Sequence, residues 1–337
     1  MFIMTARFCS LFLLLSGLVA FSPAQTATEA APGLMPPAFT TAGGGSVVLT
    51  TPGHTILYTL DGTDPVAKSN PYLAPIDLPH GGTVKARAFS KDRKTMSAVA
   101  EKTVPAVKGH ETPVPSTMVP CTQDRSWPQY DWEKRHALTS AAVKQQQPDI
   151  LFIGDSITHF FGGQQFDSYT LRGSNTWDEF YAPRKAGNLG FGWDKTENVL
   201  WRLQHGAIDG ISPKAVVMMI GTNNTGACSA PDIAQGITAI VQEFQKRLPQ
   251  AKILLLGIFP RGEKPGPQRD KIAGINQGIS KLHAPPAVTF LDIGPKFLTP
   301  EGLITKDIMP DFLHPNEKGY RIWAEAMEPT LKKLLAE

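Results

Sequence analysis

The chain has 337 residues, a length typical of two domains of about 100–200 residues each. Hydrophobic residues make up 42% of it and charged residues 19%, a balance that belongs to globular proteins and excludes an intrinsically disordered chain. The formal net charge is only +3 and the basic residues form no cluster, which argues against a nucleic-acid partner.

The N-terminal segment has the pattern of a secretory signal peptide. Arg7 precedes an almost wholly apolar run of about 14 residues, from Phe8 to Phe21, whereas a helical bilayer span needs about 20. Small residues near Ala24 offer a cleavage site, so we predict a signal peptide over residues 1–24. A membrane anchor at the same place is the alternative. Once the signal peptide is removed, we expect a secreted or periplasmic chain without a membrane span.

Residues 33–105 have the composition of a small antiparallel β-sandwich. Strand-length segments are separated by turns that contain Gly, Pro and Asn, and they lie at 46–50, 55–59 and 83–89. The segment 56–65, Ile-Leu-Tyr-Thr-Leu-Asp-Gly-Thr-Asp-Pro, resembles the small β-sandwich appended to chitobiases and other bacterial glycan-active enzymes. This resemblance implies an accessory or spacer module in a glycan context. Tyr58 and Tyr72 either stack on a sugar or pack within the module.

A proline-rich linker follows at residues 106–130, where repeated prolines disfavour regular structure and keep the chain extended. Cys121 lies in this linker and Cys228 lies in the domain that follows. In an oxidising compartment the two thiols could pair, and the sequence leaves this question open. No spacing of Cys and His residues predicts a zinc site.

From residue 131 to residue 337, short apolar runs alternate with amphipathic stretches. The pattern predicts strands at 149–154, 186–189, 215–220, 253–258 and 287–291. It predicts helices at 131–147, 196–204, 231–248, 268–282 and 317–335. Buried strands that alternate with helices form a parallel sheet covered on both faces. The expected fold class is therefore α/β, a flavodoxin-like three-layer α/β/α domain with a five-stranded parallel sheet.

Polar residues follow three of these predicted strands. Gly154-Asp155-Ser156 ends the first strand, the segment 188–194 includes the end of the second, and the segment 221–224 follows the third. In an open α/β sheet, ligands bind outside the carboxyl ends of the strands. We therefore expect these three segments to converge on one crevice.

Six segments of this domain carry a family resemblance. They are 152–156 (Phe-Ile-Gly-Asp-Ser), 188–194 (Asn-Leu-Gly-Phe-Gly-Trp-Asp), 199–203 (Val-Leu-Trp-Arg-Leu), 221–224 (Gly-Thr-Asn-Asn), 256–262 (Leu-Gly-Ile-Phe-Pro-Arg-Gly) and 311–314 (Asp-Phe-Leu-His). In this order they resemble the SGNH hydrolases, the GDSL family of esterases. Within that family the resemblance is to the subgroup typified by the catalytic subunits of intracellular platelet-activating factor acetylhydrolase. It covers about residues 131–337 and implies ester hydrolysis.

The resemblance implies a catalytic triad of Ser156, His314 and Asp311. A serine hydroxyl needs an adjacent base to act as a nucleophile, and His314 is the candidate. Asp311 lies three residues earlier and can orient the imidazole from the same loop. The alternative is that Asp311 and His314 only form the start of the last helix. Asp155 is expected to make structural hydrogen bonds, and His159 to pack or to lie at the surface.

Three N–H groups are expected to form the oxyanion hole. They belong to the backbone of Ser156, to the backbone of the 190–194 turn at Gly192 or Trp193, and to the side-chain amide of Asn223. In the relatives that the chain resembles, a glycine precedes the aspartate of this turn, and here Trp193 takes its place. The indole of Trp193 narrows the acyl pocket, offers a stacking face to a sugar, or packs over the loop.

The substrate prediction rests on three features: the signal peptide, the module of glycan-active enzymes, and a catalytic family rich in deacetylases. Together they favour removal of small acyl groups, acetyl above all, from an acetylated polysaccharide or oligosaccharide. One alternative is a phospholipid or short-chain lipid esterase with the same triad. A non-catalytic glycan-binding protein is another. We expect no cofactor and no metal, and the sequence leaves the oligomeric state open.

Overall fold

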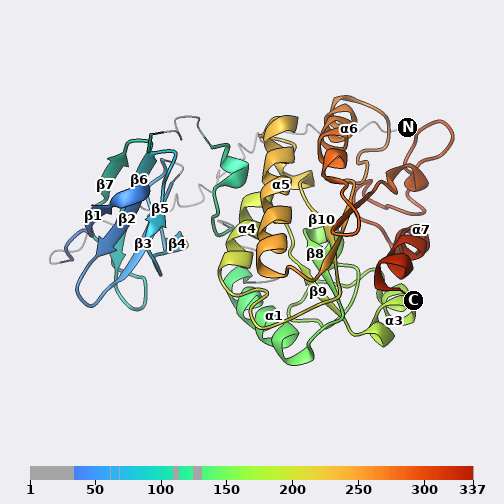
Figure 1. The fold of residues 1–337 in the computed structure, drawn as a ribbon, viewed down its shortest axis with the longest axis horizontal. Coiled ribbons are helices and arrows are strands. Elements are labelled where there is room, and N and C mark those ends of the chain that lie inside the picture. The colour runs from blue at the N-terminus through green and yellow to red at the C-terminus, as the bar shows by residue number, and fades with distance from the viewer. Residues whose placement is uncertain (1–33, 61, 68, 109–113, 124–130, 337) are drawn as a thin grey trace, which may run out of the picture.

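The computed structural model of the chain describes residues 34–60, 62–67, 69–108, 114–123 and 131–336. The predicted signal peptide lies outside these residues. Figure 1 shows a small β-sandwich beside a larger α/β domain. In the part of the chain that is described, no helix combines the length and the apolar character that crossing a membrane requires.

The β-sandwich consists of two antiparallel sheets. One has the strand order β1 (Ala38–Ala42), β2 (Ser46–Thr50), β5 (Ile76–Asp77), and the other β4 (Asn70–Pro71), β3 (Thr55–Thr59), β6 (Gly82–Phe89), β7 (Ala100–Val104). Alternate side chains of β6 are buried, as the period of a half-buried strand requires. Val47 from one sheet and Val84 from the other belong to a single core, against which Tyr58 and Tyr72 pack while partly exposed. The predicted sandwich is confirmed.

The α/β domain is built on a five-stranded parallel sheet. Its order is β12 (Val288–Leu291), β11 (Lys252–Leu256), β10 (Ala215–Met219), β8 (Ile150–Gly154), β9 (Ala186–Gly190). Every neighbouring pair is parallel, and the chain reverses its direction of travel across the sheet between β9 and β10. This is the flavodoxin-like order, with its switch point at the carboxyl ends of β8 and β10.

Helices cover both faces of this sheet. One face carries α1 (Trp132–Gln146), α4 (Thr196–Gln204), α5 (Ala230–Arg247) and α6 (Pro267–Ile279), and the other α2 (Ser156–His159), α3 (Ser174–Phe180) and α7 (Glu317–Leu335). Alternate residues of β8 divide between the two cores, because Leu151 and Ile153 pack with the first set and Phe152 with the second. The predicted three-layer fold is confirmed.

The long periodic elements lie where the sequence predicts them, whereas the short helix α3 was not predicted. The predicted helices 196–204 and 317–335 match α4 and α7 residue for residue. Helix α3 has seven residues, and its N-cap Gly173 has no side chain that could cap it, so it lacks the local signals by which a helix is found in a sequence. The cap comes instead from Glu317, distant in sequence, whose carboxylate accepts from the Thr176 N–H at 2.8 Å. Tertiary packing maintains it, since Trp177 is buried in the core under α7.

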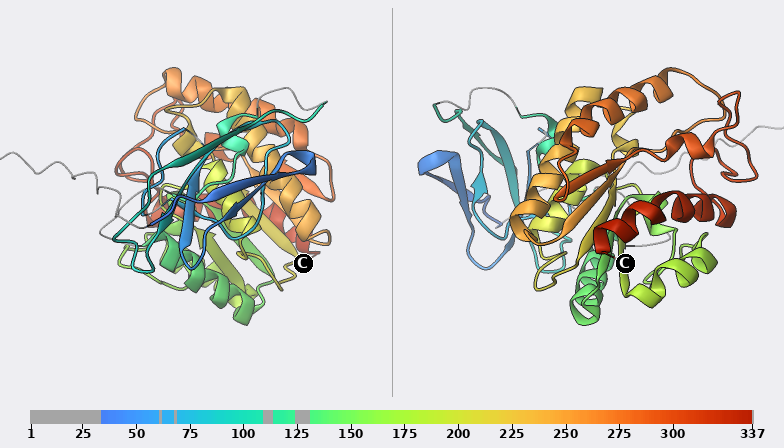
Figure 2. Two further views of the ribbon diagram at one scale, coloured as in Figure 1. Left: turned by 90° about the vertical axis from the view of Figure 1, so that its left-hand side faces the viewer. Right: turned by 45° about the vertical axis from the view of Figure 1, so that its right-hand side comes forward.

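The described part of the linker is fastened to the α/β domain. It contains a short 3-10 turn, η2 (Ser116–Met118), which lies on α4 and α5. The Thr117 hydroxyl donates a hydrogen bond of 2.6 Å to the Asp232 carbonyl, and the Thr196 hydroxyl donates one of 2.9 Å to the Thr117 carbonyl. The sandwich therefore lies on the α4 and α5 side of the domain, and Figure 2 shows it in front of the domain from that side. No disulfide bond joins Cys121 and Cys228, both of which lie in the described part of the chain.

Candidate active site

Ser156 lies at the first turn after β8, which pairs with β10 on one side and β9 on the other. Asp155 is the N-cap of α2, and its Oδ1 accepts a hydrogen bond of 2.9 Å from the Ile157 backbone N–H. This cap fixes the sharp strand-to-helix turn and keeps the Asp155 carboxyl buried. Burial raises the pKa of Asp155 to about 7. The Ser156 side chain is thus presented at the carboxyl edge of the sheet.

The loop before α7 brings His314 and Asp311 to Ser156. Ser156 Oγ lies 2.8 Å from His314 Nε2, and His314 Nδ1 lies 2.8 Å from Asp311 Oδ2. Asp311 Oδ1 accepts hydrogen bonds from the backbone N–H groups of His314 at 2.7 Å and Leu313 at 3.2 Å, so the loop folds around its own carboxylate. The N-cap of α7 is Asn316, so capping that helix does not account for Asp311.

The charges in this loop suit the base of a nucleophilic serine. Burial raises the pKa of Asp311, but hydrogen bonds from the backbone and ring of His314 outweigh it and lower the pKa to about 2. Burial lowers the pKa of His314, and Asp311 only partly opposes this. At neutral pH the imidazole is therefore neutral beside an ionised carboxylate. Nδ1 then carries the proton that Asp311 accepts, and Nε2 can accept the proton of Ser156 Oγ.

The 191–194 turn lies against the start of α2. The Phe191 N–H donates to the Gly154 carbonyl at 3.0 Å, and the Gly192 N–H donates to His159 Nδ1 at 3.2 Å. Because the Gly192 N–H already donates a hydrogen bond to the buried His159 ring, it does not serve as the predicted oxyanion donor. Trp193 remains the candidate donor from this turn. Asn223 donates a hydrogen bond of 3.0 Å from Nδ2 to the Asp194 carbonyl, so its amide lies at the same turn.

Comparison with known proteins agrees with this geometry. The model of the GDSL-like Lipase/Acylhydrolase family matches residues 152–322, and the model of the Chitobiase/beta-hexosaminidase C-terminal domain matches residues 36–101. The chain belongs to the GDSL-like lipase/acylhydrolase family. It is a serine hydrolase that acts on ester bonds.

The similar proteins cover the α/β domain of this GDSL hydrolase. Platelet-activating factor acetylhydrolase IB subunit alpha2 of Rattus norvegicus is 39% identical over 208 residues, which are 61% of this chain and 86% of the relative. Subunit alpha1 of Homo sapiens is 37% identical over 207 residues, 61% of this chain and 85% of that protein. The solved structure of a GDSL-like lipase from Bacteroides thetaiotaomicron aligns with a TM-score of 0.48 and 20% identity, covering 59% of this chain and 97% of that chain.

A buried carboxylate holds the 191–194 turn of the GDSL hydrolase in place. Asp194 accepts hydrogen bonds from three side chains: Trp132 at 2.7 Å, Arg202 at 2.8 Å and Gln123 at 3.0 Å. Asp194 and Arg202 are both completely buried. Burial raises the pKa of Asp194 to about 6, although its three donors oppose the rise. Gln123 comes from the linker, which therefore takes part in the support of the site.

A second buried network reaches the same turn through His159. The ring accepts from Gly192 at Nδ1, and its Nε2 lies 3.2 Å from Asp167 Oδ2. Arg135 of α1 lies 2.7 Å from the same carboxylate oxygen and donates to the Gly190 carbonyl at 2.8 Å. Burial lowers the pKa of His159 to about 4, so the ring is neutral with its proton on Nε2. Its proximity to Ser156 was the only sequence signal of this role, because Asp167 and Arg135 are distant in sequence.

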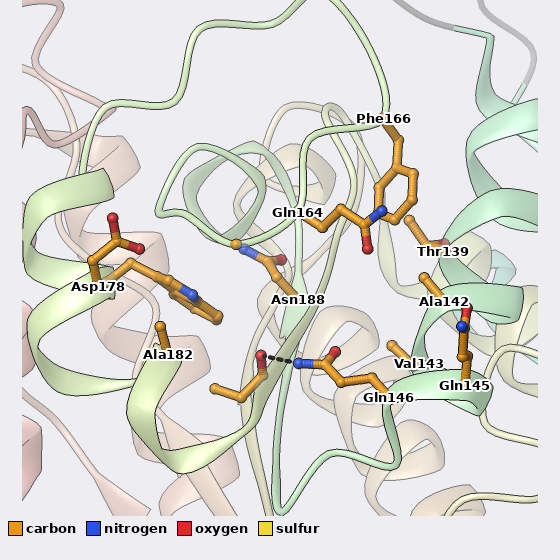
Figure 3. Close-up of a pocket in the computed structure, with 13 residues that line it drawn as sticks. Thr139, Ala142, Val143, Gln145, Gln146, Gln164, Phe166, Asp178, Ala182 and Asn188 are labelled. Carbon is orange, nitrogen blue, oxygen red and sulfur yellow. Dashed lines mark hydrogen bonds between the residues drawn. The ribbon is translucent and has the colours of Figure 1, made fainter.

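A groove of about 620 Å³ lies away from the triad. Figure 3 shows it between α1, α3 and the edge strand β9, with Gln146, Gln164, Phe166 and Asn188 among its walls. No predicted site residue lines it. Ser156 instead lies at the carboxyl edge of the sheet, directly after β8. Among the described residues, no cluster of His, Cys, Asp and Glu could hold a metal ion.

Proposed function

We propose that this GDSL hydrolase is a secreted esterase that removes acetyl groups from carbohydrate esters. The observation that carries the proposal is the hydrogen-bonded series Ser156 Oγ, His314 Nε2, His314 Nδ1 and Asp311 Oδ2, with both contacts at 2.8 Å. The series supplies a nucleophile, a neutral base and an ionised carboxylate that orients the base. These are the requirements of acyl transfer through a serine.

In the first step, Ser156 Oγ attacks the carbonyl carbon of the ester while its proton passes to His314 Nε2. The oxygen of the carbonyl becomes an oxyanion, for which the backbone N–H groups of Ser156 and Trp193 and the amide of Asn223 are the proposed donors. The tetrahedral intermediate then expels the sugar oxygen, which takes the proton from His314. This leaves the acetyl group on Ser156. Asp311 remains ionised and stabilises the imidazolium.

In the second step, a water molecule gives its proton to His314 Nε2 and attacks the acetyl carbonyl. The second tetrahedral intermediate releases acetate as the bond to Ser156 Oγ breaks, and the proton returns to the serine oxygen. Charge and atoms balance over the cycle, with one ester and one water consumed and one alcohol and one acetic acid formed, which ionises in water to acetate and a proton. No group beyond the side chains and N–H donors named above is needed.

Two findings support an acetylated carbohydrate as the substrate. The N-terminal domain matches the Chitobiase/beta-hexosaminidase C-terminal domain, and this match supports a glycan substrate. The relatives at 37–39% identity carry the name acetylhydrolase, which supports a small acyl group. The apolar run before Ala24 supports secretion, which would give the enzyme access to polymeric glycans. The name of the same relatives favours a second candidate, hydrolysis of acetyl groups from phospholipids.

The test is acetate release by the purified mature protein from acetylated xylan, compared with release from an acetylated phospholipid. We expect release from the glycan, and we expect S156A to lose it. S280A serves as the matched control, since Ser280 follows α6 and its hydroxyl donates to the Gln277 carbonyl. Release from the phospholipid alone would favour the second candidate. Equal release by S156A and the wild type would contradict the proposed mechanism.

A further inference from the structure

Trp193 has a backbone conformation that tryptophan rarely adopts. Its φ is +66°, in the left-handed region. Of the five other described non-glycine residues with positive φ, Gln147, Lys185 and Ala336 end helices, where this conformation is common, whereas Arg93 and Phe312 lie in loops. Trp193 ends no helix. Its strain therefore has another cause, and backbone strain of this kind concentrates at functional sites.

The indole of Trp193 does not contribute to the core. Its side chain is 41% exposed, whereas Phe191 and Asp194 on either side are completely buried. A large apolar side chain stabilises a fold by leaving water, and this one remains largely in contact with it. The chain thus maintains a strained backbone in order to present an aromatic ring to solvent.

The backbone of Trp193 lies beside the proposed catalytic residues. The residue before it, Gly192, is bound to His159 at the end of the helix that begins with Ser156. The residue after it, Asp194, receives the hydrogen bond from Asn223 on the neighbouring loop. Trp193 therefore lies between the elements that carry the nucleophile and one proposed oxyanion donor.

The loops that carry Asp311 and Asn223 bind polar side chains. Arg172 lies 3.4 Å from Asp311 Oδ2, and Arg261 Nη1 lies 3.2 Å from Thr222 Oγ1 on the loop that carries Asn223. One flat apolar surface together with the polar side chains on these loops matches a pyranose, which has an apolar C–H face and hydroxyl groups around it. A lipid chain would require a continuous apolar channel instead.

We infer that Trp193 forms a carbohydrate-binding subsite, on which a sugar ring of the acetylated substrate stacks while its acetyl group is held at Ser156. This inference rests on the proposed function and deepens it, because it assigns the contact that recognises the sugar.

The test compares kcat/KM for acetylated xylo-oligosaccharides with kcat/KM for methyl acetate, which has no sugar. Glycine suits the positive φ and keeps the backbone N–H, so W193G removes the ring and leaves the turn its conformation. We expect the ratio of the two kcat/KM values to fall about tenfold in W193G and to be largely restored in W193F. L138A is the matched control, because Leu138 is 39% exposed on α1, and its ratio should equal that of the wild type.

A W193G ratio equal to that of the wild type would overturn the inference, whether the two activities stay constant or fall together. In that case the wild type would still release acetate from the oligosaccharides, and the proposed function would stand. A wild type that releases none would overturn the proposed function, and the subsite with it. The two failures are therefore distinguished by the wild-type measurement.

Discussion

The two loops that meet at Ser156 are held in different ways. The 311–314 loop is held by short-range hydrogen bonds to Asp311, whose side chain is 45% exposed. The 191–194 turn is held by long-range contacts to Asp194, which is completely buried. In the proposed mechanism, the first loop carries the groups that exchange protons, and these must stay accessible. The second carries proposed hydrogen-bond donors, and these must stay fixed. Changes in the first loop should therefore affect chemistry, and changes in the second should also affect folding.

The largest expected effect follows from removal of the base. H314A should lower kcat by about 10⁵–10⁶-fold, because the Ser156 proton then has no acceptor. Its midpoint of denaturation should shift little, since His314 is only partly buried and the loop is held by Asp311. Steady-state kinetics and urea denaturation on one preparation test both statements. A large loss of stability would show that the 311–314 loop is a folding element as well.

A substitution that removes the support of the 191–194 turn should, in contrast, strongly reduce the stability of the fold. D194A leaves the Arg202 guanidinium buried without its carboxylate, which should lower the free energy of unfolding by about 3–5 kcal/mol. D307A is the matched control, because Asp307 and Lys318 form an ion pair of 2.8 Å in which both side chains are at least 65% exposed. That variant should lose less than about 1 kcal/mol. Equal losses in the two variants, measured by urea denaturation, would contradict the supporting role of Asp194.

Substitutions of His159 test the support of the 191–194 turn without leaving a large cavity in the core. H159F keeps a ring of similar size but has no acceptor for the Gly192 N–H, so kcat should fall about 10–100-fold while KM changes little. H159N offers a side-chain oxygen as acceptor and should recover part of the loss. H283N is a control at an exposed histidine and should match the wild type. A change in KM alone for H159F would assign His159 to substrate binding rather than to positioning.

The smallest expected effect is a shift in the pH profile. Burial lowers the pKa of His314, so activity should persist below the usual histidine range and fall only as pH drops through that lowered pKa, where the imidazole becomes protonated. The Arg172 charge contributes to the lowering. R172A should therefore move the acid limb of kcat/KM to higher pH. A limb that moves to lower pH in R172A would contradict this electrostatic picture.

The sequence predicted the fold because its elements are long and strongly periodic. Strands β8 and β10 are continuous apolar runs, and α4 and α7 end at local signals, so little depended on tertiary context. Helix α3 was not predicted, because its stability comes from the packing of Trp177 under α7 rather than from capping or periodicity within the helix. The parts of the site that depend on local sequence could likewise be predicted, and the parts that depend on tertiary contacts could not.

The proximity of Asp311 and His314 could be predicted because both side chains belong to one four-residue loop. The networks behind the turn could not, because Asp167 and Arg135 are separated from His159 and Gly190 by loops whose course only the fold determines. The attachment of the linker to α5 was missed for the same reason. Its proline content predicted an extended chain and carried no information about what the chain packs against.

The central claim is that acetyl passes through Ser156. The most direct measurement is peptide mapping by mass spectrometry after the enzyme is mixed with acetylated xylo-oligosaccharides and quenched in acid during turnover. The account predicts one added acetyl group on the peptide that contains Ser156, absent from S156A. Acetate release with no acetyl group on that peptide, or with the group on another residue, would contradict it.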